Sequence, residues 1–355
     1  MTDFPSERSL TRRRSAVPTI GDVARRAELS PMTVSRVVNG EPGVRPETRA
    51  RVEAVVAELG YVPNPAARLL AGVGQIRIAL LYRNPSAAYL SEMLVGSLAQ
   101  ASRSQAQLVV ERCDPDDDTA ATTRRLSERG LDGVVLPPPL CDFAGLRDLL
   151  WASGIPAVLV ATGTPPSGFC AVTIDDRAGA EQMTRHLLSL GHRRIGFVTG
   201  DPAQTATARR LDGYRAALAA AGTTPEPALV AAGDYSYRSG LHAAEQLLSR
   251  EAPSSAIFAS NDDMAAAAVA IAHRRGLDVP RDLTVVGFDD TAIATTMWPE
   301  LTTIRQPIAE IAQAAIAMLI AGAGRVGTGG PSTIEHRVLP HQLIRRSSDG
   351  PARSP

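Results

Sequence analysis

The most constraining feature of this 355-residue chain lies in residues 19–59, where helix start signals precede short apolar stripes. Thr19 is a predicted N-cap with Asp22 as its capping-box partner, and apolar residues then recur at helical spacing. Ser30 and Pro31 form a second start signal, because serine caps well and proline loses no hydrogen bond at the first helical position. These signals predict two short helices joined by a tight turn.

The second predicted helix runs from Pro31 to about Asn39 and has one apolar and one polar face. Its valines are expected to face inward, which leaves Met32, Ser35, Arg36 and Asn39 on or near the outward face. A third helix is predicted over residues 46–59. Two short helices joined by a turn form the helix-turn-helix pattern, whose second helix reads a DNA groove. The alternative is a small packed three-helix domain without that function.

Three ordered stretches favour the DNA-binding interpretation. They are Thr-Ile-Gly-Asp-Val-Ala-Arg-Arg-Ala from position 19, Ser-Pro-Met-Thr-Val-Ser-Arg-Val-Val-Asn-Gly from 30, and Glu-Leu-Gly-Tyr-Val-Pro-Asn-Pro-Ala-Ala-Arg from 58. Together they resemble the headpiece of the lac-repressor (LacI/GalR) family of bacterial transcription regulators. The resemblance implies a helix-turn-helix domain over residues 19–62 that binds a double-stranded DNA operator. The candidate DNA contacts are Thr19, Ser30, Pro31, Met32, Thr33, Ser35, Arg36, Asn39, Asn64, Arg68 and Leu70.

Within this set, Arg36 is the best candidate for base recognition. Pro31 and Met32 stand where some relatives carry polar side chains that read bases. Arginine can donate two hydrogen bonds to the edge of a guanine, so Arg36 is expected to make the specific contact.

Residues 63–74 are predicted to form a short hinge helix and a linker. Asn64 caps the helix, which is expected over residues 66–71. A helix this short needs a partner, because isolated helices below about 12 residues are marginal in water. The resemblance implies pairing with the hinge helix of a second copy in the minor groove, where Leu70 wedges into a base step and bends the duplex. The alternative is that Leu69 and Leu70 pack under the following domain.

Charge and cysteine content indicate the binding partner and the cellular compartment of the chain. Its formal net charge is zero, yet residues 1–74 hold eleven arginines against eight acidic residues, a local basic excess suited to phosphates. Residues 1–18 lack the apolar core of a secretory signal and are expected to form a flexible arm. The three cysteines lack metal-ligand spacing, so no disulfide framework, metal or cofactor is expected. We therefore predict a cytoplasmic, nucleoid-associated protein without a membrane segment.

From about residue 75 the pattern changes to alternating strands and helices. Apolar runs of strand length occur at 78–81, 108–110, 133–136 and 157–160, and again at 194–198, 228–232, 256–259 and 283–288. Such alternation predicts an α/β fold, with parallel sheets covered by helices. Two series in succession predict two similar lobes.

The second series also resembles the same family. The carrying stretches include His-Leu-Leu-Ser-Leu-Gly-His-Arg-Arg-Ile-Gly from 186, Ser-Asn-Asp-Asp-Met-Ala-Ala from 260 and Val-Val-Gly-Phe-Asp-Asp-Thr from 285. The resemblance implies a two-lobed, periplasmic-binding-protein-like domain over 75–345 that binds an effector and dimerises. Lobe N is expected at about 75–188 and 305–332, lobe C at about 189–304 and 333–345, and a flexible tail at 346–355. Without a C-terminal leucine heptad, a homodimer is favoured over a tetramer.

Polar residues that follow the predicted strands are candidate ligand groups, because ligands of α/β sheets bind beyond the carboxyl ends of the strands. Carboxylates accept from neighbouring hydroxyls and guanidinium groups donate in a fork, so polyhydroxylated ligands suit the set. The resemblance implies that Arg210 and Asp262 bind the effector and that Tyr235 covers a sugar ring. The candidates are Tyr89, Asp175, Asp176, Arg210, Tyr235, Asp262 and Asp289. The alternatives are that Asp289 braces the hinge between the lobes and that Tyr89 belongs to the core.

These features predict a sequence-specific transcriptional regulator that represses carbohydrate-catabolism genes and leaves a near-palindromic operator when a small sugar-like effector binds. One alternative is a regulator that needs a corepressor, and another is a sugar-binding protein without a DNA function. The sequence shows no nucleophile–base pair, phosphate-binding glycine loop or metal cluster, so an enzyme is not expected.

Overall fold

The computed structural model describes residues 19–38, 44–59, 75–113, 124–126, 128–323 and 334–353. The chain divides into two compact units, residues 1–75 and 76–355. Each unit has its own core and is described separately.

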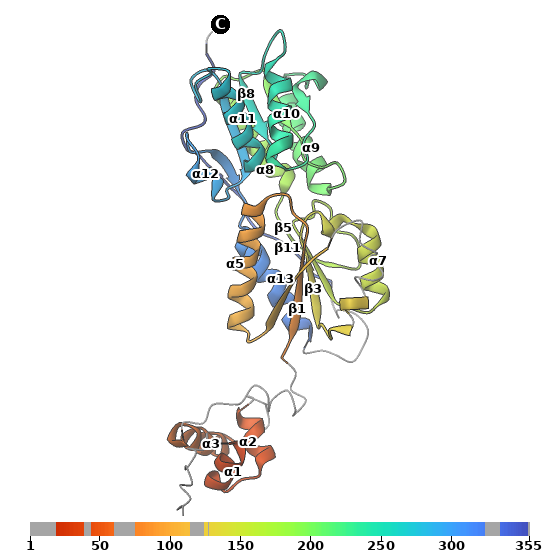
Figure 1. The fold of residues 1–355 in the computed structure, drawn as a ribbon, viewed down its shortest axis with the longest axis vertical. Helices are drawn as coiled ribbons and strands as arrows, with labels where there is room; N and C mark the ends of the chain where they lie inside the picture. Colours follow the sequence, from red (N-terminus) through yellow and green to blue (C-terminus); the bar gives the residue numbers. More distant parts are fainter. Residues whose placement is uncertain are drawn as a thin grey trace, which may run out of the picture. The chain divides into compact units, whose positions relative to one another are not determined.

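The first unit consists of three helices, α1 (Ile20–Ala27), α2 (Pro31–Val38) and α3 (Pro46–Leu59) (Figure 1). The predicted capping box of α1 is confirmed, since the Thr19 amide donates to Asp22 Oδ2 at 2.9 Å. Ser30 Oγ accepts from the Thr33 amide at 3.1 Å, as expected of an N-cap. All three helices are confirmed at the predicted positions.

A small apolar core holds these helices together. Val23, Ala27, Val34 and Val52 are fully buried within it. The ion pairs that join the helices, such as Arg26–Glu58, lie at the surface and add little stability. Packing of the apolar stripes therefore defines the unit and leaves the polar face of α2 exposed.

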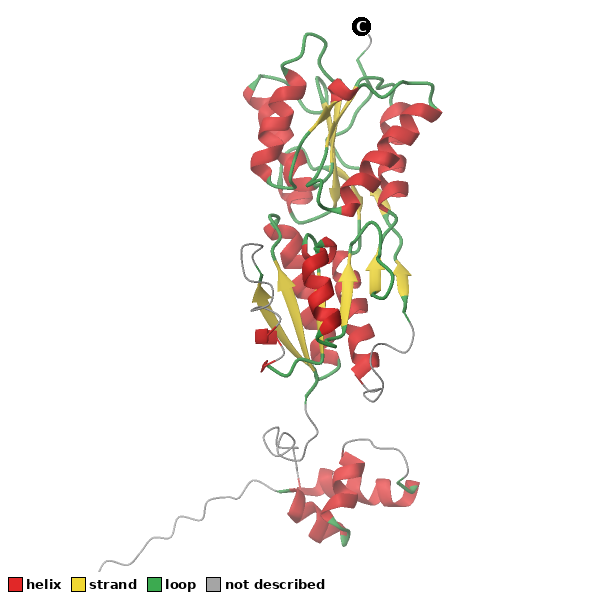
Figure 2. Ribbon diagram, turned by 90° about the vertical axis from the view of Figure 1, so that its right-hand side faces the viewer, coloured by secondary structure: helices red, strands yellow, loops and turns green. Residues whose placement is uncertain are grey.

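The second unit is an α/β structure with two lobes. Among the described residues each lobe contains a six-stranded sheet, and Figure 2 shows helices on both sides of the sheets. In lobe N the strand order is β11 (His336–Val338), β5 (Cys170–Thr173), β4 (Ala157–Val160), β3 (Gly133–Leu136), β1 (Arg77–Tyr82) and β2 (Gln107–Arg112). In lobe C it is β12 (Gln342–Ile344), β10 (Thr302–Arg305), β9 (Thr284–Asp289), β8 (Ala256–Ala259), β6 (Ile195–Val198) and β7 (Val230–Ala231).

The described strands pair in parallel except for β10 and β12, which are antiparallel. Lobe N is covered by α5 (Ala87–Arg103), α7 (Ala144–Ala152) and α13 (Ile308–Ala323), with the short helix η1 (Leu140–Asp142). Lobe C is covered by α8 (Asp176–Ser189), α9 (Thr205–Ala220), α10 (Tyr237–Leu248) and α11 (Asp262–Arg274), with η2 (Pro227–Leu229) and α12 (Ile293–Thr296). The predicted α/β class is confirmed.

The lobe bounds expected from the sequence imply that the chain crosses between the lobes near residues 188, 304 and 332, and two of these three crossings lie elsewhere. Helix α8 packs against α9 of lobe C, so the first crossing follows β5 near residue 174 and not residue 188. β11 still pairs with β5 of lobe N, so the third crossing lies between residues 338 and 342, not at 332. The second crossing follows β10, as expected. The sequence of an amphipathic helix does not reveal which sheet the helix covers, so the sequence alone could not assign α8 to lobe C.

The expectation of a flexible tail from residue 346 is wrong for the residues that the structure describes. The Ser348 side chain is fully buried, donates to the Val285 carbonyl at 2.6 Å and accepts from the Thr302 amide at 2.9 Å. Asp349 Oδ2 lies 2.8 Å from His186 Nε2. These polar residues are ordered because they satisfy hydrogen-bonding groups of lobe C. Residues 354–355 lie outside the described part.

The helices of the described residues include none with both the length and the apolar character that crossing a bilayer requires.

Candidate functional site

A cavity lies between the two lobes at the carboxyl ends of their strands. Asn84, Pro138 and Ala161 follow strands β1, β3 and β4 of lobe N, whereas Asn261, Asp289 and Gln306 end or follow β8, β9 and β10. The remaining lining residues are Pro85, Ser86, Tyr89, Gln204, Ala206, Arg210 and Tyr235. Parallel α/β sheets bind ligands at this edge, so the cavity lies where the sequence predicted it.

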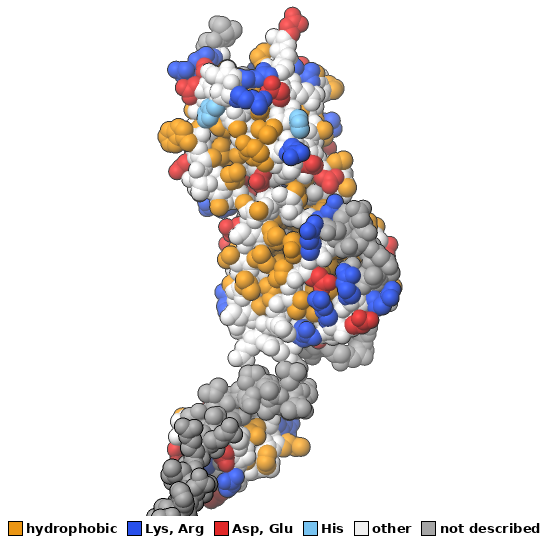
Figure 3. Space-filling view, viewed as in Figure 1, with side chains coloured by type: hydrophobic (Ala, Val, Ile, Leu, Met, Phe, Trp, Pro, Cys, Tyr) orange, Lys and Arg blue, Asp and Glu red, His pale blue; other side chains and the backbone are white. Residues whose placement is uncertain are grey.

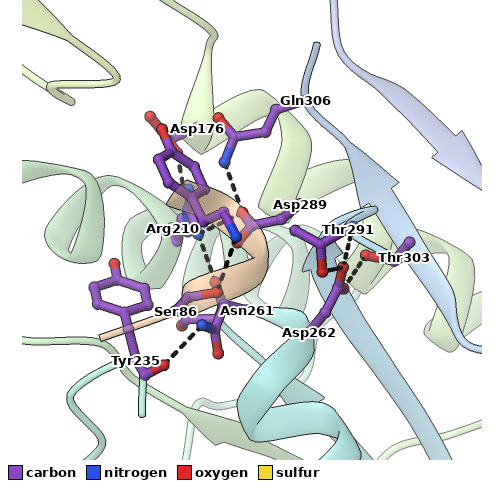
Figure 4. Close-up of polar contacts among 12 residues, drawn as sticks. Ser86, Asp176, Arg210, Tyr235, Asn261, Asp262, Asp289, Thr291, Thr303 and Gln306 are labelled. Atoms are coloured by element: carbon purple, nitrogen blue, oxygen red, sulfur yellow. Dashed lines mark hydrogen bonds and ion pairs between the residues drawn. The ribbon is translucent and has the colours of Figure 1, made fainter. Parts of the chain in front are cut away.

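Arg210 on α9 is the fixed positive charge of the cavity. Its side chain is almost fully buried, and Nε donates to Asp176 Oδ1 at 2.8 Å (Figure 4). The ring of Phe288 lies 3.7 Å from the guanidinium carbon. Burial lowers the pKa of Arg210, but Asp176, Tyr235 and Asp289 beside it together outweigh burial and raise the pKa overall. Arg210 therefore stays charged and cannot rotate freely.

Asp289 places a second titratable group in the cavity wall. It receives a hydrogen bond from Gln306 Nε2 at 2.6 Å, and its Oδ1 lies 3.6 Å from Nη1 of Arg210 (Figure 4). Burial raises the pKa of Asp289 to about 7, against the opposing effect of Arg210. Its φ of 114° is in the region that favours glycine. Strained backbone of this kind clusters at functional sites, and here it turns the end of β9 at the cavity.

Two buried polar atoms of the cavity wall have no hydrogen-bond partner among the described residues. They are the hydroxyl of Tyr89 and Oε1 of Gln306. An unsatisfied buried polar group costs about 1–3 kcal/mol, so such atoms call for a partner. Burial raises the pKa of Tyr89 well above its usual value, which keeps the hydroxyl protonated and able to donate. The Tyr89 ring belongs to the core, as the alternative interpretation held, but its hydroxyl end lines the cavity.

Tyr235 forms another part of the wall. Its hydroxyl lies 2.7 Å from Thr207 Oγ1, and its carbonyl accepts from Asn261 Nδ2 at 2.9 Å. A Cβ at Gly200 would lie 2.0 Å from Cζ of the Tyr235 ring. Glycine at position 200 therefore allows the ring to pack against the backbone beside the cavity.

Three predicted ligand residues do not line the cavity, and one of them, Asp176, lies behind Arg210 and pairs with it. Asp262, at the start of α11, is fully buried, and its carboxylate accepts from the Thr291 amide at 2.8 Å and from Thr303 Oγ1 at 2.6 Å (Figure 4). Asp175 is exposed and caps α8 by accepting from the Ala178 amide at 2.9 Å. Asp262 and Asp175 both follow strands, as the prediction required. Their carboxylates, however, accept hydrogen bonds from backbone amides and, for Asp262, from a threonine hydroxyl.

Several lining residues were not predicted, and Asn261, Gln306, Gln204 and Ser86 are the polar ones with most burial. Gln306 directly follows β10 and Asn261 lies two residues after β8, so the same rule could have identified them. Charged side chains give the stronger signal of a ligand group in a sequence, and Asp262, one position after Asn261, was therefore the predicted residue. Gln204 and Ser86 cap α9 and α5, which gives no signal of a ligand.

The lobes also touch each other directly around the cavity. Ser86 Oγ of lobe N donates to Asp263 Oδ2 of lobe C at 2.5 Å. Asp142 of lobe N accepts from the Thr205 amide at the start of α9, at 2.9 Å. A Cβ at Gly163 would lie 2.7 Å from backbone atoms of Ala206, so the lobes approach to backbone contact. The cavity that these contacts close has a volume of about 30 Å³.

The outward face of α2 carries the predicted DNA contacts of the first unit. Met32 is 75% exposed and Arg36 is exposed, while Val34 and Val37 face the core. Thr19, Ser30 and Thr33 take part in the caps described above, and Pro31 begins the helix. Ser35 is half-buried. Asn39, Asn64, Arg68, Leu70 and the predicted hinge helix lie outside the described residues.

The sequence matches two protein-family models. Residues 19–64 match the model of bacterial regulatory proteins of the lacI family. Residues 184–348 match the model of a periplasmic binding protein-like domain.

Relatives cover nearly the whole chain. Catabolite control protein A of Priestia megaterium is 32% identical over 334 residues, which span 93% of this chain and 98% of that protein. A complex of the transcriptional regulator CelR with cellobiose superposes with a TM-score of 0.71 at 31% identity, covering 93% of this chain and 99% of the other. The lac repressor dimer bound to operator and the anti-inducer ONPF gives a TM-score of 0.71 at 27% identity, with 94% and 99% covered.

Proposed function

The chain belongs to the lacI family of bacterial regulatory proteins and is a DNA-binding transcriptional regulator, not an enzyme, and we propose that it represses carbohydrate-catabolism genes until a sugar-like effector releases it from its operator. The cavity between the lobes carries this proposal. Its wall combines a fixed guanidinium, a carboxyl group and four side-chain amides, and the Tyr89 hydroxyl and Oε1 of Gln306 have no partner among the described residues. A ligand rich in hydroxyl groups can satisfy all of them.

The chemistry of individual atoms supports a neutral polyhydroxylated effector. Arg210 is already paired with Asp176 and Asp289, so the cavity holds no uncompensated positive charge for an anion. Oε1 of Gln306 accepts a hydrogen bond and the Tyr89 hydroxyl donates one, so a ligand hydroxyl that donates and accepts fits both. The structure of the similar regulator CelR in complex with cellobiose supports the same ligand class.

Effector binding must change the arrangement of the lobes. Typical small-molecule sites have volumes of about 300–1,000 Å³. The cavity offers about 30 Å³, too little for a sugar ring while Ser86 and Asp142 bridge the lobes. A ring that enters therefore moves the lobes apart or shifts one against the other. A ligand that binds one arrangement better shifts the population toward it, and this couples the cavity to DNA binding.

We propose that the protein acts as a homodimer on a near-palindromic operator. Apolar side chains gather on the faces of both lobes seen in Figure 3, and among the exposed apolar residues are Val95 and Leu98 of α5 and Trp298 after α12. Exposed patches of this kind mark interaction surfaces. In a dimer the second helix-turn-helix unit binds at high effective concentration, so a change in lobe arrangement that separates the two units weakens both.

On DNA, α2 is the proposed reading helix, with Arg36 as the specific contact and Met32 as an apolar one. A regulator of this kind works where the DNA is, which favours the cytoplasm and association with the nucleoid.

The proposal is tested with the full chain and genomic DNA. Fragments selected by the purified protein would be labelled, and sugars would be titrated against the complex at physiological salt while fluorescence anisotropy is followed. We expect one sugar class to release the DNA, whereas the Arg210→Ala variant should bind the fragments but not respond. The variant Arg215→Ala, on the same helix and exposed, is the matched control. Tighter DNA binding with sugar would indicate a corepressor, and binding that shows no preference among fragments would exclude the regulator.

A further inference from the structure

A second and larger pocket adjoins the cavity at the mouth of the cleft between the lobes. Its volume is about 550 Å³, and it shares Asn84, Pro85 and Gln204 with the cavity. That volume lies in the range of small-molecule sites, about 300–1,000 Å³. The two spaces are therefore adjacent compartments of one cleft, of which only the outer one has room for a ring in this lobe arrangement.

Gln204 stands at the junction of the two compartments. Its side chain is 6% exposed, and the backbone on either side is engaged, since its amide donates to the Asp201 carbonyl at 3.0 Å and its carbonyl accepts from Thr207. The side-chain amide makes no hydrogen bond to any other residue that the structure describes. Gln204 lines both compartments, so its side-chain amide presents one donor group and one acceptor to whatever occupies the cleft.

The outer compartment carries complementary charges on its two sides. Lobe N contributes Arg83, which is exposed and forms no ion pair with the described residues, and lobe C contributes Asp201 and Asp234. Asp201 Oδ1 accepts from the Ala203 amide at 2.9 Å, and its other oxygen is available. A guanidinium that donates in a fork and a carboxylate that accepts from two hydroxyls are suited to vicinal hydroxyl groups.

We propose that the effector has two ring units, as in a disaccharide or a glycoside of that length, with one unit in the cavity beside Arg210 and the other in the outer pocket. This proposal rests on the proposed function of the cavity. The linkage between the units lies beside Gln204, and Arg83 and Asp201 bind the outer unit. The outer unit contributes affinity without any movement of the lobes, whereas the inner unit supplies the binding energy that moves them.

Calorimetry on the full chain tests the proposal with defined probes. These are glucose, galactose and xylose, and the disaccharides cellobiose, maltose, lactose and xylobiose. We expect at least one disaccharide to bind about tenfold tighter than its constituent monosaccharides, since one added hydrogen bond to a charged group is worth that factor. Equal affinity for every disaccharide and its monosaccharides would overturn the proposal.

Two variants separate the compartments. Arg83→Ala should lower the affinity for the disaccharide about tenfold and leave the affinity for the monosaccharide unchanged, because Arg83 lines only the outer pocket. Gln204→Ala should lower the affinity for both probes, and Arg215→Ala, the exposed control, for neither. An equal loss for both probes with Arg83→Ala would overturn the two-unit ligand.

The failure of this proposal can be distinguished from failure of the proposed function. If monosaccharides bind and release the DNA, and disaccharides bind no more tightly, the result would support the sugar-responsive regulator and exclude the outer subsite. If none of the seven sugars binds while the protein still selects DNA fragments, both the sugar effector and the outer subsite are excluded.

Discussion

The three-helix unit and the cavity between the lobes use polar side chains in opposite ways. In the helical unit, Thr19 and Ser30 form hydrogen bonds to groups three residues away, and the face of α2 is left exposed. In the cavity, Arg210 pairs with Asp176, 34 residues earlier, and two polar atoms remain unpaired. The first arrangement is complete in itself, whereas the second is complete only with a ligand. The three-helix unit can thus be rigid on DNA, while the two lobes change their arrangement when a ligand binds.

The largest expected effect comes from removing the charge at the centre of the cavity. Arg210→Ala should lower the free energy of unfolding of the second unit by about 3–5 kcal/mol, because Asp176 would be left buried without its partner. Urea unfolding followed by circular dichroism measures this loss, with Arg215→Ala as the control. An unchanged stability would show that the ion pair is not what organises the cavity.

Asp262 tests the difference between polar groups that are satisfied within the fold and those left for a ligand. It was predicted to bind the effector but is hydrogen-bonded to two threonines. Asp262→Ala should cost about 1–3 kcal/mol of stability, because the Thr291 amide and the Thr303 hydroxyl lose their acceptor. The effector affinity of the folded protein, measured by calorimetry, should not change. Asn261→Ala is the matched neighbour in the cavity wall and should weaken effector binding. A larger loss of effector affinity with Asp262→Ala than with Asn261→Ala would show that Asp262 contributes to the effector site.

On the DNA side, Arg36→Ala should weaken specific binding by about 1–3 kcal/mol if the guanidinium contacts a guanine edge. Anisotropy titrations with the selected fragment and with random DNA measure the difference. Arg25→Ala, on the exposed surface of α1, is the control. An equal loss on all sequences would assign Arg36 to phosphate contact.

The smallest expected effect is a pH dependence centred on Asp289. Its pKa is raised from 3.8 to about 7, so its contribution to stability is fully present below pH 3.8 and is lost as the pH rises through about 7. The charged form accepts hydroxyl hydrogen bonds, so effector affinity should rise a few-fold between pH 6 and pH 8. Asp289→Asn should flatten this rise in calorimetry at both pH values. A rise that persists in Asp289→Asn would point to a different titrating group.

The sequence predicted the helical unit well because its signals are local. Caps and apolar spacing determine α1, α2 and α3, and all lie within a few residues of the positions that they specify. The same holds for the alternation of strands and helices, because burial of a short strand is visible in its composition.

The cavity was predicted only in part. Its position at the strand ends followed from the fold, and Tyr89, Arg210, Tyr235 and Asp289 do line it, with Asp176 behind Arg210. Whether a carboxylate faces a cavity or a threonine depends on residues that are distant in sequence, as the Thr303 contact of Asp262 shows. The order of residues 346–353 depends likewise on lobe C, which their polar composition cannot reveal.

The placement of β11, β12 and Ser348 has a consequence for synthesis of the chain. Lobe N receives α13 and β11 from its last fifty residues, and lobe C receives β12 and the segment around Ser348. Domains tend to fold as they emerge from the ribosome, in order from the N-terminus. The three-helix unit can therefore assemble early, while both lobes stay unfinished until translation is nearly over. A transcript cut short near its 3′ end would yield a folded three-helix unit that can contact DNA, without the completed lobes that bind the effector.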